Sequence, residues 1–169
     1  MADNRKLIPK ILKWEGGFAN IPGDTGGATN KGITIATYRK VFGKERTIED
    51  LKTITDVEWQ YIYKTMFWDR WKADDIKNQS IAELLVDWCW TSGVWGIKFP
   101  QRVLGVKDDG IVGPKTLAAI NDYEDQEELF NKLWNRRKKH FQDIAKGGKA
   151  KFLGGWLRRL NDFKYREEE

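Results

Sequence analysis

The segment 81–91 is the feature that most restricts how this chain can fold. It reads I-A-E-L-L-V-D-W-C-W-T, so apolar side chains would occupy nearly every side of a helix built from it. A helix that is apolar all round is buried, and other elements must cover it. We therefore expect a mainly helical domain around a central helix that begins at Asn78 or Ser80.

Further amphipathic helices are predicted where apolar residues recur at a spacing of three or four. The predicted ranges are 7–14, 35–42, 55–67, 126–145 and 152–160. Thr55 with Glu58 forms a capping signal for the third of these. Its stripe of Trp59, Tyr63 and Phe67 is interpreted as core packing. In the helix 126–145 the apolar stripe includes Arg137, which we interpret as burial of its aliphatic stem, with a solvated basic outer face.

Two residues of the central segment have side chains that are unusual in an apolar helix. Asp87 would bury a charge, which is costly without a partner, so we expect it to be salt-bridged or to cap a neighbouring backbone. Cys89 is the single cysteine of the chain and is interpreted as a buried thiol. His140 is the single histidine, lies in a basic run and is no obvious partner for that thiol.

The stretch 14–34 has the sequence expected of a functional site. Glu15 follows the helix 7–14 directly, and Gly16-Gly17 then end that helix. An acid at this helix end is locally unfavourable, because the last turn prefers cations. Local rules are most often broken at functional sites.

The residues after Glu15 favour tight backbone turns and a short hairpin. Residues 22–27 read P-G-D-T-G-G, and alternation around Ile33 predicts a short strand. A helix-end Glu15 near a hairpin that carries Asp24 suggests a pair of carboxylates, the equipment of glycoside hydrolysis. The alternative, a phosphate-binding loop at Lys31, needs a preceding strand and a Ser or Thr after the lysine. Here a helix precedes and Gly32 follows.

Two motifs resemble a known family. The first motif is E-G-G-F at 15–18, and the second is D-T-G-G-A-T-N-K-G-I-T at 24–34. Together they resemble glycoside hydrolase family 108. This family consists of peptidoglycan-cleaving N-acetylmuramidases and includes phage endolysins and proteins labelled secretion activators. The resemblance implies a lysozyme-like α+β fold, with a hairpin near residues 18–36 as one lip of a cleft. It also implies cleavage of the β-1,4 bond between N-acetylmuramic acid and N-acetylglucosamine.

The same resemblance assigns roles to individual residues. Glu15 would be the general acid, and Asp24 would stay ionised and position the attacking water. Thr29 would help hold that water, with Thr25 as a neighbouring candidate. The implied substrate-binding candidates are Phe18, Asn30, Trp90 and Ser92. Similarity to phage-type lysozymes further implies inversion at the anomeric carbon.

A second resemblance covers residues 99–120, which read F-P-Q-R-V-L-G-V-K-D-D-G-I-V-G-P-K-T-L-A-A-I. This phrase is similar to the predicted peptidoglycan-binding segment that accompanies family 108. Gln101, Asp109 and Thr116 are expected to stabilise its turn, and Pro114 to begin a helix. We therefore expect a catalytic segment 1–92 and a peptidoglycan-binding segment 93–169, packed as one integrated domain.

Composition narrows the partners less than the motifs do. The 169 residues carry a net charge of +5 and nine tryptophans, which would suit a cell wall, a membrane surface or nucleic acid. The basic residues are spread along the chain, which disfavours a nucleic-acid-binding domain, and no apolar run could span a membrane. A non-enzymatic wall-binding protein or secretion activator is the main alternative.

The remaining expectations concern cofactors, assembly and location. One His and one Cys are too few for a zinc site, so we expect no metal and no cofactor. The expected partner is bacterial peptidoglycan, and a monomer is favoured. The N-terminus lacks the continuous apolar run of a signal peptide. We expect synthesis in the bacterial cytoplasm and action on the wall, in the periplasm or outside.

Overall fold

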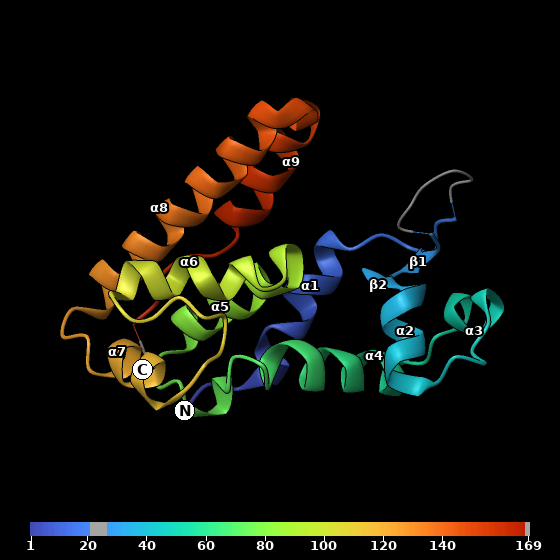
Figure 1. Ribbon diagram of the computed structural model, residues 1–169, viewed down its shortest axis with the longest axis horizontal. Coiled ribbons are helices and arrows are strands. Elements are labelled where there is room, and N and C mark those ends of the chain that lie inside the picture. The colour runs from blue at the N-terminus through green and yellow to red at the C-terminus, as the bar shows by residue number, and fades with distance from the viewer. Residues whose placement is uncertain (21–26, 168–169) are drawn as a thin grey trace.

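The computed structural model describes residues 1–20 and 27–167, and the described part is mainly helical (Figure 1). In chain order its elements are η1 (Asn4–Lys6), α1 (Ile8–Trp14), β1 (Thr29–Asn30), β2 (Ile33–Thr34), α2 (Ile35–Phe42), α3 (Ile48–Lys52), α4 (Asp56–Tyr63), η2 (Lys64–Trp68), η3 (Ala73–Asp75), α5 (Gln79–Ser92), α6 (Trp95–Leu104), α7 (Pro114–Asn121), α8 (Gln126–Ile144), η4 (Ala145–Lys149) and α9 (Ala150–Asn161). The predicted fold class, helical with one small hairpin, is confirmed.

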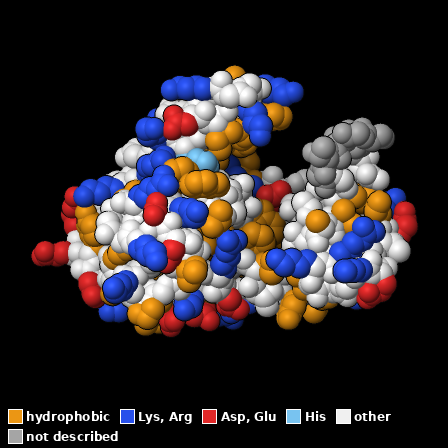
Figure 2. All heavy atoms as spheres, viewed as in Figure 1, with side chains coloured by type: hydrophobic (Ala, Val, Ile, Leu, Met, Phe, Trp, Pro, Cys, Tyr) orange, Lys and Arg blue, Asp and Glu red, His pale blue; other side chains and the backbone are white. Residues whose placement is uncertain are grey.

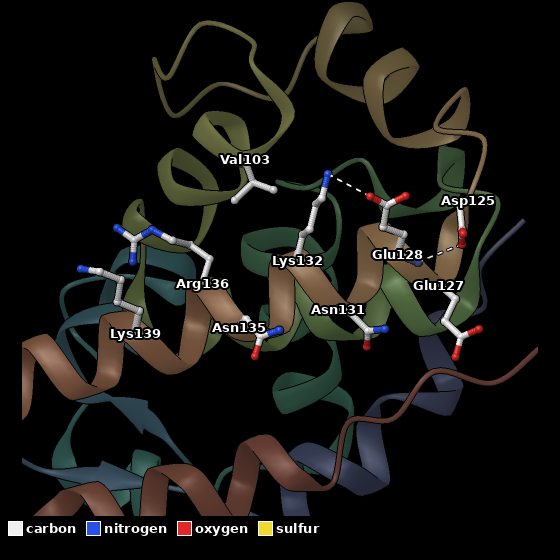
Figure 3. Close-up of a pocket in the computed structure, with 9 residues that line it drawn as sticks. All are labelled: Val103, Asp125, Glu127, Glu128, Asn131, Lys132, Asn135, Arg136 and Lys139. Carbon is white, nitrogen blue, oxygen red and sulfur yellow. Dashed lines mark hydrogen bonds and ion pairs between the residues drawn. The ribbon is translucent and has the colours of Figure 1, made fainter.

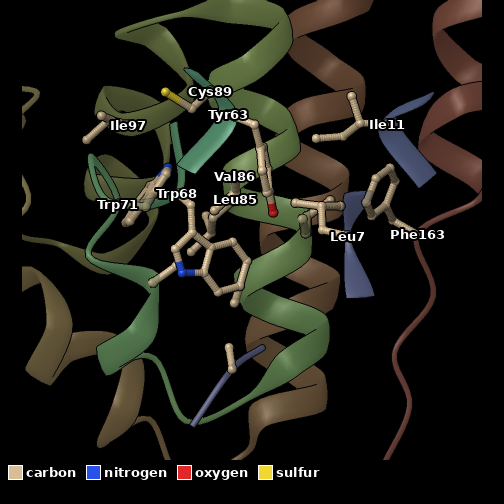
Figure 4. Packing of buried hydrophobic residues seen from close by; sticks show 14 of the residues in the cluster. Leu7, Ile11, Tyr63, Trp68, Trp71, Leu85, Val86, Cys89, Ile97 and Phe163 are labelled. Atoms are coloured by element: carbon tan, nitrogen blue, oxygen red, sulfur yellow. The ribbon is translucent and has the colours of Figure 1, made fainter. Parts of the chain in front are cut away.

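Helix α5 is the central helix, as its sequence predicts. Asn78 caps it by accepting a hydrogen bond from the backbone N–H of Ile81. Every residue from Ser80 to Cys89 is buried. Side chains from α1, η2, α6 and the chain after α9 meet around α5 (Figure 4). Burial raises the pKa of the Cys89 thiol to about 11, which agrees with a structural role for that residue.

A hairpin and two short helices form a lobe beside this core. Strand β1 pairs with β2 in antiparallel register, and Ala19 forms a further bridge to Thr29. Thr55 and Glu58 form the predicted capping box at the start of α4, and Thr47 with Asp50 forms a second one at the start of α3. Helix α4 runs from this lobe back toward the core (Figure 1).

The C-terminal helices α8 and α9 lie antiparallel and project from the core as an arm (Figure 1). Gly147 and Gly148 depart from helical backbone angles at the tip of the arm, where the sequence predicts the end of the long helix. Gly148 has a φ of 96°, a conformation that glycine adopts without steric cost. The arm therefore folds back on itself at the glycine pair.

The loop before α7 is held as the sequence predicts. The Gln101 side chain donates to Asp109, to the carbonyl of Ile111 and to the hydroxyl of Thr116, and it accepts from the N–H of Gly110. Pro114 occupies the first turn of α7. This network gives the side chains of Gln101, Asp109 and Thr116 a structural role.

Two features differ from expectation. Helix α6 was not predicted, because Gly96 and Pro100 lie inside it and both residues disfavour helix interiors. Gly96 is needed there, since a Cβ at this position would lie 2.5 Å from the backbone N of Cys89. The interpretation of Arg137 was also wrong, because the whole side chain, guanidinium included, is buried.

No helix among the described residues is long and apolar enough to cross a membrane.

Candidate functional site

Glu15 stands at the end of α1, where the chain leaves helical geometry. Its backbone angles are extended (φ −88°, ψ 137°), and its N–H still donates to the carbonyl of Ile11 in the last turn. Its side chain is 18% exposed. The carboxyl therefore projects from the end of a helix into a largely enclosed environment.

Two donors hold one oxygen of this carboxyl. The indole Nε1 of Trp90 and Nη1 of Arg159 each lie 2.8 Å from Oε1 of Glu15. Because both donors bind the same oxygen, the carboxyl is fixed in orientation. Trp90 comes from α5 and Arg159 from α9, so helices distant in the sequence converge on Glu15.

The hairpin turn makes room for the other oxygen. Lys31 (φ 50°) and Gly32 (φ 83°) form the two-residue connection between Asn30 and Ile33, with the positive φ values of a type I′ turn. A Cβ on Gly32 would lie 2.7 Å from Oε2 of Glu15. Gly32 is therefore required both by the turn and by the close approach of the carboxyl.

An aromatic cluster supports Trp90 and the turn together. The predicted stripe of Trp59, Tyr63 and Phe67 packs against Trp90, with Phe67 nearest at 4.6 Å between ring centroids. The indole of Trp59 also donates to the carbonyl of Lys31 at 3.0 Å. The interpretation of this stripe as part of the core is confirmed. The stripe also contacts Trp90 and the carbonyl of Lys31, which lie on two sides of the Glu15 carboxyl.

Glu15 lines a cavity of about 400 Å³ between the hairpin, the end of α5 and the arm. The space-filling view shows this side of the molecule hollowed between the arm and the hairpin lobe (Figure 2). The lining residues are Glu15, Gly32, Trp90, Thr91, Ser92, Phe141, Ile144, Lys149, Trp156 and Arg159. The cavity thus offers aromatic faces and a lysine around one carboxyl group.

A buried chain of ion pairs anchors Arg159. Its Nη2 and Nε bind the two oxygens of Asp87 at 2.7 and 3.2 Å, and Nη2 of Arg137 binds Oδ2 of Asp87 at 2.7 Å. The predicted salt bridge of Asp87 is therefore confirmed. Burial alone would raise the pKa of the Asp87 carboxyl, but the two guanidinium groups outweigh it and the pKa is lowered. Asp87 is accordingly held as an anion between two cations.

The structure places the sequence-predicted site residues in different environments. Trp90 and Ser92 line the cavity with Glu15. Thr29 lies in β1, where its backbone pairs with Ala19. Asp24 and the alternative Thr25 lie outside the described residues.

Phe18 and Asn30 do not line this cavity. Asn30 is 6% exposed, and its amide donates to the carbonyls of Leu51 and Lys52, which ties the hairpin to the end of α3. Phe18 packs against the core with the ammonium of Lys52 over its ring. Both residues therefore have structural contacts, and their role in substrate binding stays a prediction.

Sequence reasoning missed the contribution of the arm. Arg159 lies on the apolar stripe of α9, three residues after Trp156 and next to Leu160. A cation at a core position implies a buried partner, and Asp87 in the apolar central segment implies the same. The two anomalies together were a signal for an ion pair between α5 and α9, but spacing along the chain does not show which cation is used.

A larger hollow of about 750 Å³ runs along the outer face of α8 (Figure 3). Asp125, Glu128, Lys132 and Lys139 of its lining have local structural partners. Asp125 caps α8 by accepting from the N–H of Glu128, and Glu128 pairs with Lys132 one turn later. These contacts are typical of a solvated helix face. We therefore take the cavity at Glu15, and not this hollow, as the candidate functional site.

Within residues 1–20 and 27–167, no group of three or more His, Cys, Asp or Glu side chains is arranged to hold a metal ion. The two carboxylates described above, Glu15 and Asp87, are both engaged by arginine. The expectation of activity without a metal stays a prediction.

Comparisons with known proteins agree on the family and on the class of the fold. Residues 8–93 match the family model described as "Glycosyl hydrolase 108", and residues 95–161 match the "Predicted Peptidoglycan domain". The solved structure of SagA from Brucella abortus is similar, with 28% sequence identity, a TM-score of 0.77 and coverage of 96% of each chain. No curated protein sequence matches the chain significantly.

The buried ion pairs generate a stability prediction. Replacing Asp87 by Asn should lower the free energy of unfolding by about 3–5 kcal/mol, because two buried guanidinium groups lose their counter-charge. The matched control, Asp143→Asn, removes an exposed partner of Lys139 on α8 and should leave the denaturation midpoint near wild type.

The ion pairs of Asp87 also make the free energy of unfolding depend on pH, which provides a check on this prediction. Because the pKa of Asp87 is lowered from 3.8 in the folded protein, its contribution is complete above that value and is lost as the pH falls through the lower folded pKa. Urea denaturation should show a constant gap between Asp87→Asn and wild type near neutral pH, which narrows in strong acid. An Asp87→Asn protein as stable as wild type near neutral pH would contradict the assigned role.

Proposed function

Because the chain belongs to the glycosyl hydrolase 108 family, we propose that it hydrolyses peptidoglycan at the β-1,4 bond between N-acetylmuramic acid and N-acetylglucosamine. Membership in the family supports glycoside hydrolase activity, and the second matched segment supports peptidoglycan as the partner. The finer assignment, a muramidase that acts on the wall in the periplasm or outside the cell, rests on the motifs around Glu15. A non-enzymatic wall-binding protein is the alternative to be tested.

The observation that carries the proposal is the environment of Glu15. Its Oε1 is held by Trp90 and Arg159, and Oε2 lies against Gly32 at the wall of the cavity. A general acid must present its proton in a fixed direction to the leaving oxygen. A carboxyl bound through one oxygen meets this requirement, with the proton on Oε2 directed at the glycosidic oxygen of a bound strand.

The second carboxylate is proposed to be Asp24, which would orient and deprotonate the attacking water. The described residues on either side of it lie beside the site, because the backbone of Lys31 donates to the carbonyl of Gly16 and Ala19 pairs with Thr29. Thr29 is proposed to hold the water, with Thr25 as the alternative. Ser92 and Trp90 are proposed to contact the sugar from the opposite wall.

Substitution of the proposed acid is the primary test. Glu15→Gln should fold normally and lose at least about a hundredfold in turnover of purified peptidoglycan, because the amide cannot protonate the leaving group. Glu127→Gln is the matched control, since Glu127 lines the hollow along α8 and should keep wild-type turnover. Mass spectrometry of the wild-type products should find N-acetylmuramic acid at the new reducing ends.

Other outcomes of this test identify other functions. Turnover by well-folded Glu15→Gln at the wild-type rate would remove Glu15 from the mechanism. Reducing-end glucosamine would indicate a glucosaminidase, and new amino termini would indicate an amidase or peptidase. Wall binding without any turnover by wild type would favour the non-enzymatic alternative.

Inversion at the anomeric carbon is the expected stereochemical course. This proposal rests mainly on the similarity of the Glu15 and Asp24 motifs to phage-type lysozymes. Inverting enzymes separate the two carboxylates by roughly 6.5–9.5 Å to admit a water, and the length of chain between Glu15 and Asp24 is compatible with such a separation. NMR during cleavage should therefore show the α anomer first. A first-formed β anomer, or a covalent glycosyl adduct on Asp24, would show retention through a nucleophile.

A further inference from the structure

The cavity at Glu15 continues onto an aromatic stack along the arm. Trp156 stacks on the buried ring of Phe141 with centroids 5.5 Å apart, and both line the cavity. Phe152, one turn toward the tip of the arm, stacks on Trp156 at 5.9 Å with an angle of 27° between the ring planes. Phe152 is 47% exposed. Near-parallel rings thus lead from the enclosed site to the open surface.

The charge beside this stack is positive. Lys149 lines the cavity, and Nζ of Lys151 lies 5.1 Å from the ring centroid of Phe152. Lys146 and Lys149 lie in η4 at the tip of the arm. Peptidoglycan combines apolar sugar faces with the carboxylates of its lactyl and peptide groups. Aromatic planes next to ammonium groups match that combination.

We propose that Trp156 and Phe152 form a glycan-binding platform that extends the cleft beyond Glu15, with Lys149 and Lys151 facing the carboxylates of the strand. This inference rests on the proposed function, because the ligand proposed for the platform is a peptidoglycan strand whose cleavable bond lies at Glu15. It locates wall contact on one face of α9, within the segment that matches the peptidoglycan model. Continuity with the cavity distinguishes Phe152 from the other exposed aromatic side chains.

The test measures binding separately from turnover. In a Glu15→Gln background, Phe152→Ala should weaken binding of soluble, uncrosslinked peptidoglycan strands about fivefold or more, the loss expected for one stacking contact. Tyr61→Ala is the matched control, because Tyr61 is an aromatic residue 54% exposed on α4. In the active protein, Phe152→Ala should raise KM for long strands and leave kcat unchanged.

Two results would overturn the proposed platform. Binding by Phe152→Ala equal to that of the Tyr61→Ala control would do so. Vesicles of phosphatidylglycerol provide the other arm, since Phe152-dependent vesicle binding without strand binding would assign the stack to a membrane surface. Because binding is measured without catalysis, loss of the platform is distinguishable from failure of the proposed hydrolysis.

A second inference follows from the ion pairs rather than from the aromatic stack. Arg159 binds Asp87 through two nitrogens and Glu15 through the third. Asp87 is itself fixed by Arg137. The guanidinium therefore has its position set from inside the core before it reaches Glu15. It belongs to the segment that matches the peptidoglycan model, whereas Glu15 belongs to the hydrolase segment.

The geometry points to Arg159 as a positioning residue for the proposed acid. It would hold Oε1 so that Oε2 keeps its direction toward the leaving oxygen. The segment 95–161 would then complete the hydrolytic site and not act as a separate binding module. This inference also rests on the proposed role of Glu15. The Arg159 variants are therefore interpreted only after Glu15→Gln has been shown to lose turnover.

Chemical rescue tests the assignment. Arg159→Ala should lower kcat about a hundredfold, the scale expected for a misplaced catalytic group, with a smaller change in KM. Added guanidinium at concentrations below those that denature the protein should restore part of kcat, while sodium chloride and urea should not. Arg158→Ala, at the exposed neighbouring position, should match wild type.

The conservative variant covers the case in which Arg159→Ala does not fold. Arg159→Lys retains a charge but cannot bind Asp87 through two nitrogens and Glu15 through a third at once. We expect it to fold with an intermediate kcat. Wild-type kcat in either variant, or a loss in Arg159→Ala that guanidinium does not recover, would overturn the positioning role.

Discussion

The interaction on which the rest of the structure depends is the pairing of Asp87 with Arg137 and Arg159 inside the core. A buried carboxylate is tolerated only when its charge is matched and its oxygens are bonded. Here three guanidinium nitrogens bind the two oxygens of Asp87, and the pair formed by Nε and Nη2 of Arg159 is bidentate. The central helix α5 is thereby joined to both helices of the arm.

This internal pairing has a consequence at the surface. Because Arg159 is fixed by Asp87, its remaining nitrogen reaches Glu15 from a constrained position. Trp90 reaches the same oxygen from α5, and its ring is held by the aromatic side chains of α4 and η2. The carboxyl therefore sits between two donors whose own positions are set by core packing. Such pre-organisation is what the proposed acid catalysis requires.

The hairpin contributes by close approach of its backbone. Gly32 brings the turn against the carboxyl of Glu15 without a side chain between them, and Asn30 ties the hairpin to α3. The arm contributes Arg159 and the aromatic wall of the cavity. The hydrolase segment and the peptidoglycan segment thus meet at one carboxyl, which accounts for the absence of a linker-like sequence between them.

The sequence by itself determined the elements whose causes are local. Apolar spacing indicated α1, α5, α8 and α9, and the capping signal of Thr55 with Glu58 indicated the start of α4. The anomaly of an acid at a helix end singled out Glu15. These signals are readable because caps, turns and amphipathic faces act over a few residues.

Only the tertiary structure decided which distant side chains meet. Arg159 and Glu15 are 144 positions apart, and Arg137 and Asp87 are 50 apart. Apolar spacing puts Arg137 and Arg159 on the stripes of their helices, but it does not show which acid each of them binds. Helix α6 was hidden for a related reason, since its glycine and proline oppose a helix locally and are accommodated by packing on α5. Partner choice in a core depends on shape and charge in three dimensions, which a one-dimensional pattern does not contain.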